Sequence, residues 1–367
     1  MFINQNKNSD QVYFMRLALQ QAQKVLGNTK ENPAVGCVIT KNNHVIQAAH
    51  TSIDGRPHAE QNALSYSQKK LYNCQIYITL EPCSHFGKTA ACTDIIIKKK
   101  IKKVFFSILD PDVRSFNKSS KIFNKFKISV NKGLLKKEIA KFYKSYINYK
   151  KEGLPYVTSK IAITKDFYTK NKHKKWITNK FSRGRVHLLR SIHDCVMTSS
   201  NTVIEDNPRL TCRIKGIKNR SPNKIILDNK LKIGINSNVI KDSKFNQTII
   251  FYNKINKKKI KLLKRLNIKL YRIPLDDRGC INLTKALTKA KELGFSRIFL
   301  ETGIKLNTSF LKEKLINNFK IFISNKKAGL KGVKSFKNSF KTFLKSKQYQ
   351  IEQVNLLGDK LISYELK

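Results

Sequence analysis

Three potential metal ligands constrain this chain more than any other feature of its sequence. His58 stands in the segment PHAE, Cys83 closes the segment LEPC, and Cys92 follows after a further eight residues. One imidazole and two thiolates are a set that Zn²⁺ accepts as three protein ligands, with the fourth tetrahedral position open to water. Because an open position is typical of a catalytic zinc site, the fold must bring these segments to one point.

Glu60 lies two residues beyond His58, where its carboxylate can stand beside a metal without coordinating it. Zinc acidifies its bound water toward neutrality, so hydroxide becomes available at physiological pH. We expect Glu60 to take a proton from that water and pass it to a ring nitrogen and a leaving amine, as in zinc deaminases. The alternatives are unrelated buried cysteines or a closed structural site, for which His85 is the nearby fourth ligand but lies very close to Cys83.

The net charge of +50 over 367 residues usually indicates a nucleic acid or an anionic membrane as partner. The excess is nearly all Lys, spread along the chain and accompanied by abundant Asn and Ile, which is what AT-rich codon usage produces. The lysines form no single stripe interleaved with aromatic residues, as a nucleic-acid platform needs. We therefore expect no specific nucleic-acid partner, although a basic chain would help to capture phosphorylated substrates.

The sequence predicts a cytoplasmic protein with no membrane partner. Its first residues lack a cationic region followed by an apolar one, and no stretch approaches the ~20 apolar residues of a membrane span. In a reducing compartment cysteines are more often ligands, nucleophiles or core residues than disulfides. Cys37, Cys195 and Cys212 lie in or beside apolar runs and are predicted to be buried, whereas Cys74 and Cys280 have no assigned role.

Two α/β segments are predicted, over residues 1–150 and 151–367, with the join in the sequence KKEGLP. Strands of the first segment are predicted from apolar runs and a hairpin pattern at 35–40, 45–49, 75–80 and 104–108. Its helices are predicted to begin at Asp10, as an N-cap, and near His58, and to cover 94–100 and 134–149. Residues 116–130 are weakly patterned.

The second segment alternates strands and helices, which implies a mainly parallel sheet covered on both faces. Its predicted strands cover residues 156–163, 195–198, 224–227, 248–252, 268–273, 297–300 and 320–324. Its predicted helices cover residues 182–190, 256–266, 284–293 and 309–317. Residues 331–347 are rich in Lys, Ser and Phe and are predicted to be a mobile surface region.

These motifs resemble those of a known family, the bifunctional riboflavin-biosynthesis deaminase/reductases. The insert SHFGKTAA between the cysteines matches the family's Ser-His-x-Gly-Lys/Arg-Thr pattern, and NPAVGC and Asp110-Pro111 match as well. The resemblance implies an N-terminal cytidine-deaminase-like domain, in which Asn32 and Lys88 contact the substrate, and a C-terminal domain similar to dihydrofolate reductases in fold. It also implies Zn²⁺ and NADPH as cofactors and a homodimer.

In the second segment the resemblance alone assigns the site residues, because neither a G-x-G-x-x-G nor a Walker loop is present. The positions that the family turns toward the nicotinamide cofactor are Ala162, Trp176, Thr202, Asp206, Asn229 and Gly303. The positions that it turns toward the substrate are Lys174, Arg190, Leu210, Arg213 and Glu301. Among the latter, Arg190 and Arg213 suit phosphate, which guanidinium binds in a bidentate fashion.

Two loops depart from the family pattern. The family's Ser-Leu-Asp-Gly is TKDF at residues 164–167, and the loop that follows is two residues shorter. A Phe in place of Gly at position 167 is expected to exclude left-handed backbone angles and to add bulk near the cofactor. After Asp110-Pro111, the residues DVRS replace a Gly-containing stretch, so the family's loop geometry is not predicted there.

The resemblance implies two successive reactions. The N-terminal domain would remove the 2-amino group of diamino-hydroxy-ribosylaminopyrimidine 5′-phosphate, and the C-terminal domain would reduce the ribosyl group to ribityl, with hydride from NADPH to the sugar C1′. Two alternatives stay open. A nucleic-acid-editing deaminase would suit the basic charge but not the insert between the cysteines or the second segment. A deaminase with a catalytically decayed reductase domain would suit the altered residues 164–167.

Overall fold

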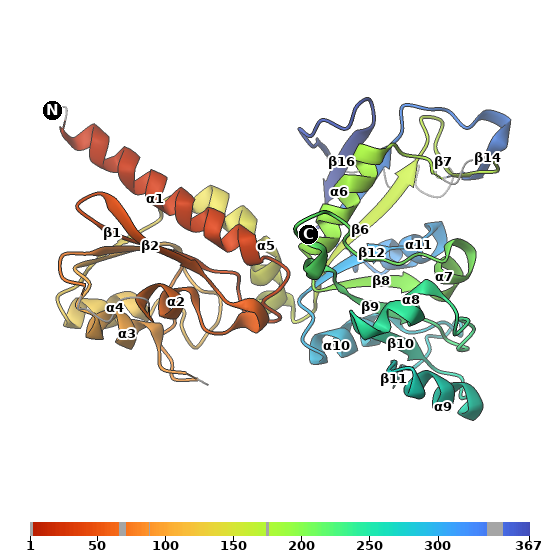
Figure 1. Cartoon of the computed structure of the whole chain (residues 1–367), viewed down its shortest axis with the longest axis horizontal. Coiled ribbons are helices and arrows are strands. Elements are labelled where there is room, and N and C mark those ends of the chain that lie inside the picture. Colours follow the sequence, from red (N-terminus) through yellow and green to blue (C-terminus); the bar gives the residue numbers. More distant parts are fainter. Residues whose placement is uncertain (1–2, 66–70, 88, 174–175, 336–347) are drawn as a thin grey trace. The chain divides into compact units, whose positions relative to one another are not determined.

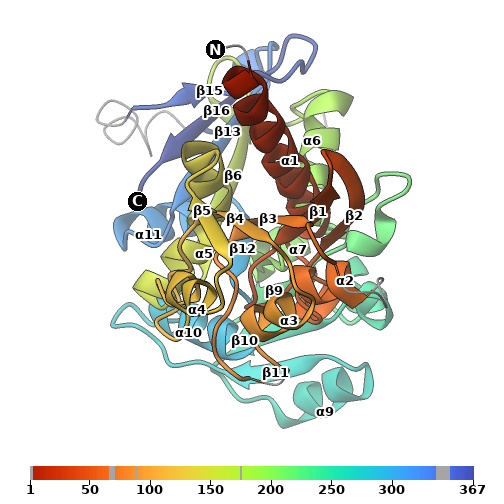
Figure 2. The same cartoon turned by 90° about the vertical axis from the view of Figure 1, so that its left-hand side faces the viewer.

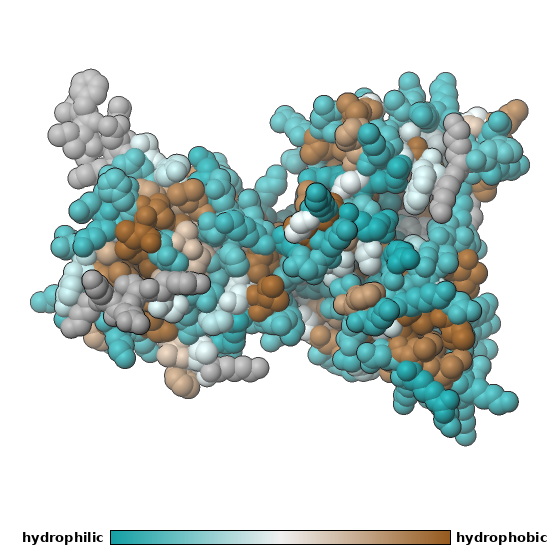
Figure 3. Space-filling model, viewed as in Figure 1, coloured by the Kyte–Doolittle hydropathy of each residue, from teal (hydrophilic) through white to brown (hydrophobic). Residues whose placement is uncertain are grey.

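The computed structural model describes residues 3–65, 71–87, 89–173, 176–335 and 348–367. The chain forms two compact units, Met1–Leu154 and Pro155–Lys367, each with its own β-sheet (Figure 1). Hydrophilic residues are spread over the visible face of each unit and are not gathered in one band (Figure 3).

The first unit is built on a five-stranded sheet in the order β2-β1-β3-β4-β5. Strand β1 (Gly36–Lys41) runs antiparallel to its neighbours β2 (His44–His50) and β3 (Gln75–Leu80), and β4 (Lys103–Ile108) and β5 (Ser129–Lys132) continue parallel to β3. One face carries α1 (Ile3–Val25) and α5 (Lys136–Glu152) (Figures 1 and 2). The opposite face carries α2 (Ala59–Ser65), α3 (Cys92–Lys98) and α4 (Ser119–Lys125).

Helix α1 packs directly on the backbone of β1. A Cβ atom at Gly36 would lie 1.8 Å from the carbonyl oxygen of Ala18, so only glycine permits this approach. On α5, the Tyr143 hydroxyl lies 2.7 Å from Thr79 Oγ1 and donates to the Ala34 carbonyl at 2.9 Å. These contacts fix the carboxyl end of β3, after which Cys83 follows.

The second unit holds a nine-stranded sheet in the order β11-β10-β9-β8-β12-β6-β13-β16-β15. Its first seven strands run parallel, and β16 (Lys360–Glu365) and β15 (Gln350–Ile351) each add an antiparallel pairing. The parallel strands are β6 (Tyr156–Ile163), β8 (Cys195–Ser199), β9 (Asn223–Leu227), β10 (Thr248–Tyr252), β11 (Lys269–Arg272), β12 (Arg297–Glu301) and β13 (Asn318–Ile323). A separate two-stranded sheet pairs β7 (Tyr168–Asn171) with β14 (Gly332–Ser335).

The connections of this sheet run in two directions. The chain passes from β6 to β8 and on to β11 toward one edge, with α6 (Lys180–Ser191), α7 (Ser200–Asp206), α8 (Asn238–Lys241) and α9 (Lys257–Arg265) between strands. It returns through α10 (Leu283–Glu292) to β12 and through α11 (Ile304–Lys312) to β13. Right-handed crossovers therefore place α6 on one face and α10 and α11 on the other, as Figures 1 and 2 show. The carboxyl ends of β8 and β12 then flank a switch point, where open α/β sheets bind ligands.

The α/β class and all predicted strand positions are confirmed, but two helix predictions are wrong. Helix α1 begins at Ile3, so Asp10 lies inside it and accepts a hydrogen bond from Asn43 Nδ2 at 3.0 Å instead of capping the helix. Helix α11 covers Ile304–Lys312 rather than 309–317, because the left-handed backbone of Lys314, with φ of 53°, ends it earlier.

The region 331–347 also differs from its prediction. Gly332–Ser335 forms β14, while residues 336–347 lie outside the described residues.

Cys37, Cys195 and Cys212 are buried as predicted, and Cys74 is buried as well, whereas Cys280 is exposed. No helix in the described parts of the chain is long and apolar enough to cross a membrane.

Candidate active sites

His58, Cys83 and Cys92 come together at one point of the first unit. His58 precedes α2, Cys83 follows β3 in a loop, and Cys92 is the first residue of α3. The Nδ1 atom of His58 lies 3.6 Å from Cys83 Sγ and 3.5 Å from Cys92 Sγ, and the three ligand atoms lie within 4.8 Å of one another. Tetrahedral zinc with ordinary bond lengths separates nitrogen and sulfur ligands by about 3.6 Å, so the three side chains fit the ion.

The electrostatics of this cluster also suit a metal. Hydrogen bonding from Cys92, including its backbone N–H at 3.3 Å from Cys83 Sγ, lowers the pKa of the Cys83 thiol and favours the thiolate that zinc binds. Glu60, in the first turn of α2, is 3 % exposed. Burial, together with the nearby Cys83 charge, raises the pKa of Glu60 to about 7, which suits a group that accepts and releases a proton near neutrality.

A buried carboxylate, Glu81, organises the loop that follows β4. It accepts hydrogen bonds from the backbone N–H groups of Asp110, Asn117 and Ser119, at 2.9 to 3.2 Å, and from the Ser119 hydroxyl at 2.8 Å. This role of Glu81 was not predicted from the sequence, although a carboxylate that continues the buried apolar run of β3 needs such partners.

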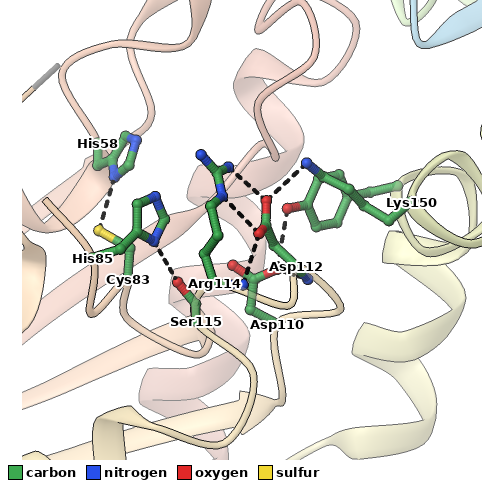
Figure 4. Close-up of polar contacts among 9 residues, drawn as sticks. His58, Cys83, His85, Asp110, Asp112, Arg114, Ser115 and Lys150 are labelled. Carbon is green, nitrogen blue, oxygen red and sulfur yellow. Dashed lines mark hydrogen bonds and ion pairs between the residues drawn. The ribbon is translucent and has the colours of Figure 1, made fainter. Parts of the chain in front are cut away.

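Side chains close the loop where the family has a glycine-containing stretch. Asp110 Oδ1 accepts the Asp112 N–H at 3.0 Å, and Asp112 Oδ1 accepts the Arg114 N–H at 3.1 Å. Ser115 Oγ lies 3.0 Å from His85 Nδ1, which joins this loop to the insert between the two cysteines (Figure 4). His85 is therefore engaged with Ser115, and it is not part of the group of possible metal ligands.

The predicted substrate contacts of the first unit are Asn32 and Lys88. Asn32 packs against the loop that leads to His58, since a Cβ atom at Gly55 would lie 2.4 Å from Asn32 Nδ2. Lys88 lies outside the described residues. Next to it, Thr89 Oγ1 accepts a hydrogen bond from Arg56 Nη1 at 2.8 Å, which ties the insert to the residues before His58.

In the second unit, Arg190 and Glu301 form a buried ion pair. Arg190 Nε donates to Glu301 Oε1 at 2.5 Å and Nη2 donates to Oε2 at 3.0 Å, while Nη1 donates to the Thr211 carbonyl at 2.9 Å. Glu301 occupies the Nε–Nη2 edge of the guanidinium in this structure, and phosphate binding by Arg190 stays a prediction. Sequence spacing could not reveal the pair, since its partners are 111 residues apart.

Glu301 also interacts electrostatically with Lys160 of β6, which was not predicted to be a site residue. Burial lowers the pKa of Lys160 and opposes the ionisation of Glu301, yet Arg190 and Lys160 together hold the pKa of Glu301 below its ordinary value.

Arg213 is exposed, and its backbone N–H donates to His187 Nδ1 at 3.3 Å. Leu210 is buried with φ of 57°, and Lys174 lies outside the described residues.

Two of the predicted cofactor residues, Thr202 and Gly303, lie at the switch point of the sheet. Thr202, after β8, has its hydroxyl 3.4 Å from that of Thr302, the residue after β12. Gly303 caps α11, and a Cβ atom there would meet no atom within 4 Å, so the space beside it is open. Ala162 lies on β6, the strand beside β12.

The other cofactor predictions lie at separate places. Asp206 ends α7 and contacts Lys170 of β7, 3.4 Å from its Nζ. Asn229 follows β9 and donates to the Gly279 carbonyl at 3.1 Å. Trp176 is exposed, with the Arg183 guanidinium 5.0 Å from its ring centroid, and lines a cavity of about 250 Å³.

The expectation for position 167 is also wrong. Phe167 adopts a left-handed backbone, with φ of 68°. The turn is held by its N–H, which donates to the Thr164 carbonyl at 2.9 Å, and by Asp166, whose carboxylate accepts the Ala328 and Gly329 N–H groups at 2.8 to 3.1 Å. These hydrogen bonds offset the ~1–2 kcal/mol that a left-handed non-glycine residue costs.

Comparison with known proteins agrees with this two-part architecture. Residues 155–356 match the RibD C-terminal domain, and residues 8–108 match the cytidine and deoxycytidylate deaminase zinc-binding region. The chain is 33 % identical over 353 residues to the riboflavin biosynthesis protein RibD of Aquifex aeolicus, covering 96 % of this chain and 97 % of that protein.

Two solved structures have the same fold over almost the whole chain. Acinetobacter baumannii RibD is 26 % identical with a TM-score of 0.84, covering 98 % of this chain and 99 % of that one. The diaminohydroxyphosphoribosylaminopyrimidine deaminase/5-amino-6-(5-phosphoribosylamino)uracil reductase of Thermotoga maritima is 29 % identical with a TM-score of 0.83 and the same coverage. The chain therefore belongs to the RibD family, the bifunctional deaminase/reductases of riboflavin biosynthesis.

Proposed function

We propose that the first domain hydrolytically deaminates the 2-amino group of diaminohydroxyphosphoribosylaminopyrimidine 5′-phosphate. The observation that carries this proposal is the pair of distances, 3.6 and 3.5 Å, from His58 Nδ1 to the two cysteine sulfurs, beside a buried Glu60. Zinc at this position would supply an acidified water molecule as nucleophile. The Thermotoga maritima relative is named for this substrate, which supports the same choice here.

Each residue of the cluster has a proposed task. His58, Cys83 and Cys92 hold the ion through one nitrogen and two sulfur atoms. Glu60 takes a proton from the attacking water and delivers it to the ring nitrogen, and it then moves the second proton, from the added hydroxyl, to the amine, which leaves as ammonia. Asn32 and Lys88 are proposed to contact the substrate, on the strength of the family resemblance. Because Glu60 is buried, bulk water cannot compete for its proton.

We further propose that the second domain reduces the ribosyl group to ribityl with NADPH. The cofactor supplies the hydride, and the protein positions it against the sugar C1′. Thr202 and Gly303 at the switch point are its best-supported contacts, and Ala162, Trp176, Asp206 and Asn229 are proposed from the resemblance. Glu301, Leu210, Arg213 and Lys174 are proposed on the substrate side. A role for Arg190 remains proposed there as the partner that orients Glu301.

The resemblance also supports a cytoplasmic homodimer as our proposal for the state of the protein in the cell.

One experiment separates the two activities. The purified protein is incubated with the diamino-pyrimidine nucleotide, with and without NADPH, and the products are resolved by mass. The proposal predicts a deaminated product without NADPH and a deaminated, reduced product with it. A product that is deaminated but never reduced would support the decayed-reductase alternative, and no deamination would refute the first activity.

A further inference from the structure

Arg114 presents a positive charge beside the deaminase site. Its Nε donates to Asp112 Oδ1 at 2.9 Å and its Nη2 donates to Asp112 Oδ2 at 2.7 Å, so the guanidinium is fixed in a bidentate pair (Figure 4). The Asp112 carboxylate also accepts a hydrogen bond from Lys150 Nζ at 2.9 Å. The Arg114 side chain is 60 % exposed, whereas that of Asp112 is 9 % exposed.

The loop contacts place Arg114 next to the insert that follows Cys83. Ser115, the next residue, lies 3.0 Å from His85, which is two residues beyond Cys83. In Figure 4 the His85 ring accordingly lies between His58 and the Arg114 side chain.

The fold does not need Arg114 to hold this loop. Glu81 already binds three backbone N–H groups of the loop, and Asp110 accepts both the Asp112 N–H at 3.0 Å and the Tyr146 hydroxyl at 3.1 Å. Lys150 alone would neutralise Asp112. The Arg114 guanidinium is exposed and held rigidly, but it is not needed to neutralise Asp112. A role in binding a ligand therefore suits it better than a purely structural role.

The unused donors suit a phosphate group. A guanidinium carries five N–H donors, and Asp112 takes two of them. Within the described residues, no other acceptor is recorded for the side chain of Arg114. Arginine binds phosphate with charge-assisted, geometrically defined hydrogen bonds, and a donor already fixed by Asp112 loses little conformational entropy on binding.

We propose that Arg114, positioned by Asp112, binds the 5′-phosphate of the pyrimidine nucleotide in the deaminase site and selects phosphorylated over unphosphorylated substrates. This inference rests on the proposed deaminase function. Arg114 is a specificity residue in this account, because it contacts a part of the substrate that does not react. Asp112 is a positioning residue that acts through Arg114.

The test compares Arg114→Gln and Arg114→Lys with wild type on two substrates, the pyrimidine nucleotide and the riboside left after phosphatase treatment. For Arg114→Gln, KM for the nucleotide should rise by about 10- to 100-fold, the loss expected for a hydrogen bond to a charged group, with a smaller change in kcat. KM for the riboside should stay unchanged. KM of Arg114→Lys for the nucleotide should lie between the values of wild type and Arg114→Gln. Inhibition by ribose 5-phosphate should weaken in parallel.

Arg16→Gln is the matched control, because Arg16 forms an exposed ion pair with Glu138, 3.5 Å apart, in the same domain. This variant should discriminate between nucleotide and riboside as wild type does. Equal nucleotide-to-riboside ratios of kcat/KM in wild type and both Arg114 variants would overturn the inference while leaving the deaminase intact. Wild type inactive on both substrates would instead refute the proposed function. If Arg114→Gln fails to fold, as judged by thermal unfolding, Arg114→Lys with ribose 5-phosphate inhibition decides the matter.

Discussion

The Nδ1 atom of His58 lies 3.5 Å from the Sγ atom of Cys92, although the two residues are 34 positions apart in the chain. That separation of nitrogen and sulfur is what a shared tetrahedral zinc ion requires. The start of α2 and the start of α3 are thus held together at the same point as the loop after β3. The three possible metal ligands and Glu60 therefore belong to one cluster around this contact.

Removing either cysteine ligand should remove the metal. Purified wild type should hold about one zinc per chain through three protein ligands, and Cys83→Ser or Cys92→Ser should lose it, because a hydroxyl is a poor substitute for a thiolate. Elemental analysis of the purified variants measures this. Cys280→Ser is the control, since Cys280 is exposed and lies in the second unit. A full zinc complement in both ligand variants would refute the assignment.

Neutralising Glu301 should destabilise the second domain strongly. Glu301→Gln leaves the Arg190 guanidinium buried without its counter-charge, and breaking a buried pair in this way costs about 3–5 kcal/mol. The control is Glu292→Gln, which breaks the exposed pair with Lys289 and should cost under about 1 kcal/mol. Urea unfolding of both variants provides the comparison. If the two variants lost similar amounts of unfolding free energy, the importance of the buried pair would be contradicted.

Lys224 should make stability depend on pH. Its side chain is fully buried on β9, and burial lowers the pKa of Lys224 to about 8. Between that value and the ordinary value of 10.5, the unfolded chain binds the proton and the folded chain does not, so this contribution to stability grows as pH rises and is lost as pH falls through 8. The difference in unfolding free energy between wild type and Lys224→Met should follow this trend.

The same measurement on Lys257→Met, which alters an exposed lysine of α9, should give a difference that hardly changes with pH. If the difference in unfolding free energy between wild type and Lys224→Met stays constant between pH 8 and pH 10.5, the buried lysine is charged in the folded protein and the prediction is wrong.

The high positive charge should have little influence on catalysis. If the net charge of +50 reflects codon usage, excess transfer RNA at physiological ionic strength should inhibit nucleotide deamination only weakly. The reason is that nonspecific contacts to phosphates are lost as the salt concentration rises. Kinetic assays with transfer RNA present, followed by a search for inosine or uridine in that RNA, test this. Strong competitive inhibition together with an edited base would favour the nucleic-acid-editing alternative.

Local chemistry in the sequence grouped three residues that the structure brings together. Metal ligation demands particular side chains at a common point, so His58, Cys83 and Cys92 could be grouped before their positions in space were known. The same is true of long strands such as β6, whose eight residues carry a clear apolar pattern. Some short elements gave no such signal: β15 has two residues, and α7 buries only Val203.

Contacts between distant segments could not be predicted in this way. Arg190 and Glu301 meet because α6 packs beside the end of β12, which no spacing along the chain reveals. Likewise, Phe167 was expected to avoid positive φ, but hydrogen bonds accepted by the Thr164 carbonyl and the Asp166 carboxylate hold the turn in that conformation. In both cases tertiary contacts override what the local sequence favours.

The most direct test of the account is the Glu60→Gln variant, which keeps the shape of the side chain but cannot move protons. Ammonia release from the pyrimidine nucleotide should fall by at least ~10²–10⁴-fold, the usual contribution of a general acid–base group. Zinc content should remain at the wild-type level, and NADPH oxidation on previously deaminated substrate should be unchanged. Near-normal ammonia release from zinc-loaded Glu60→Gln would contradict the central claim, because the deamination would then proceed without the carboxylate assigned to it.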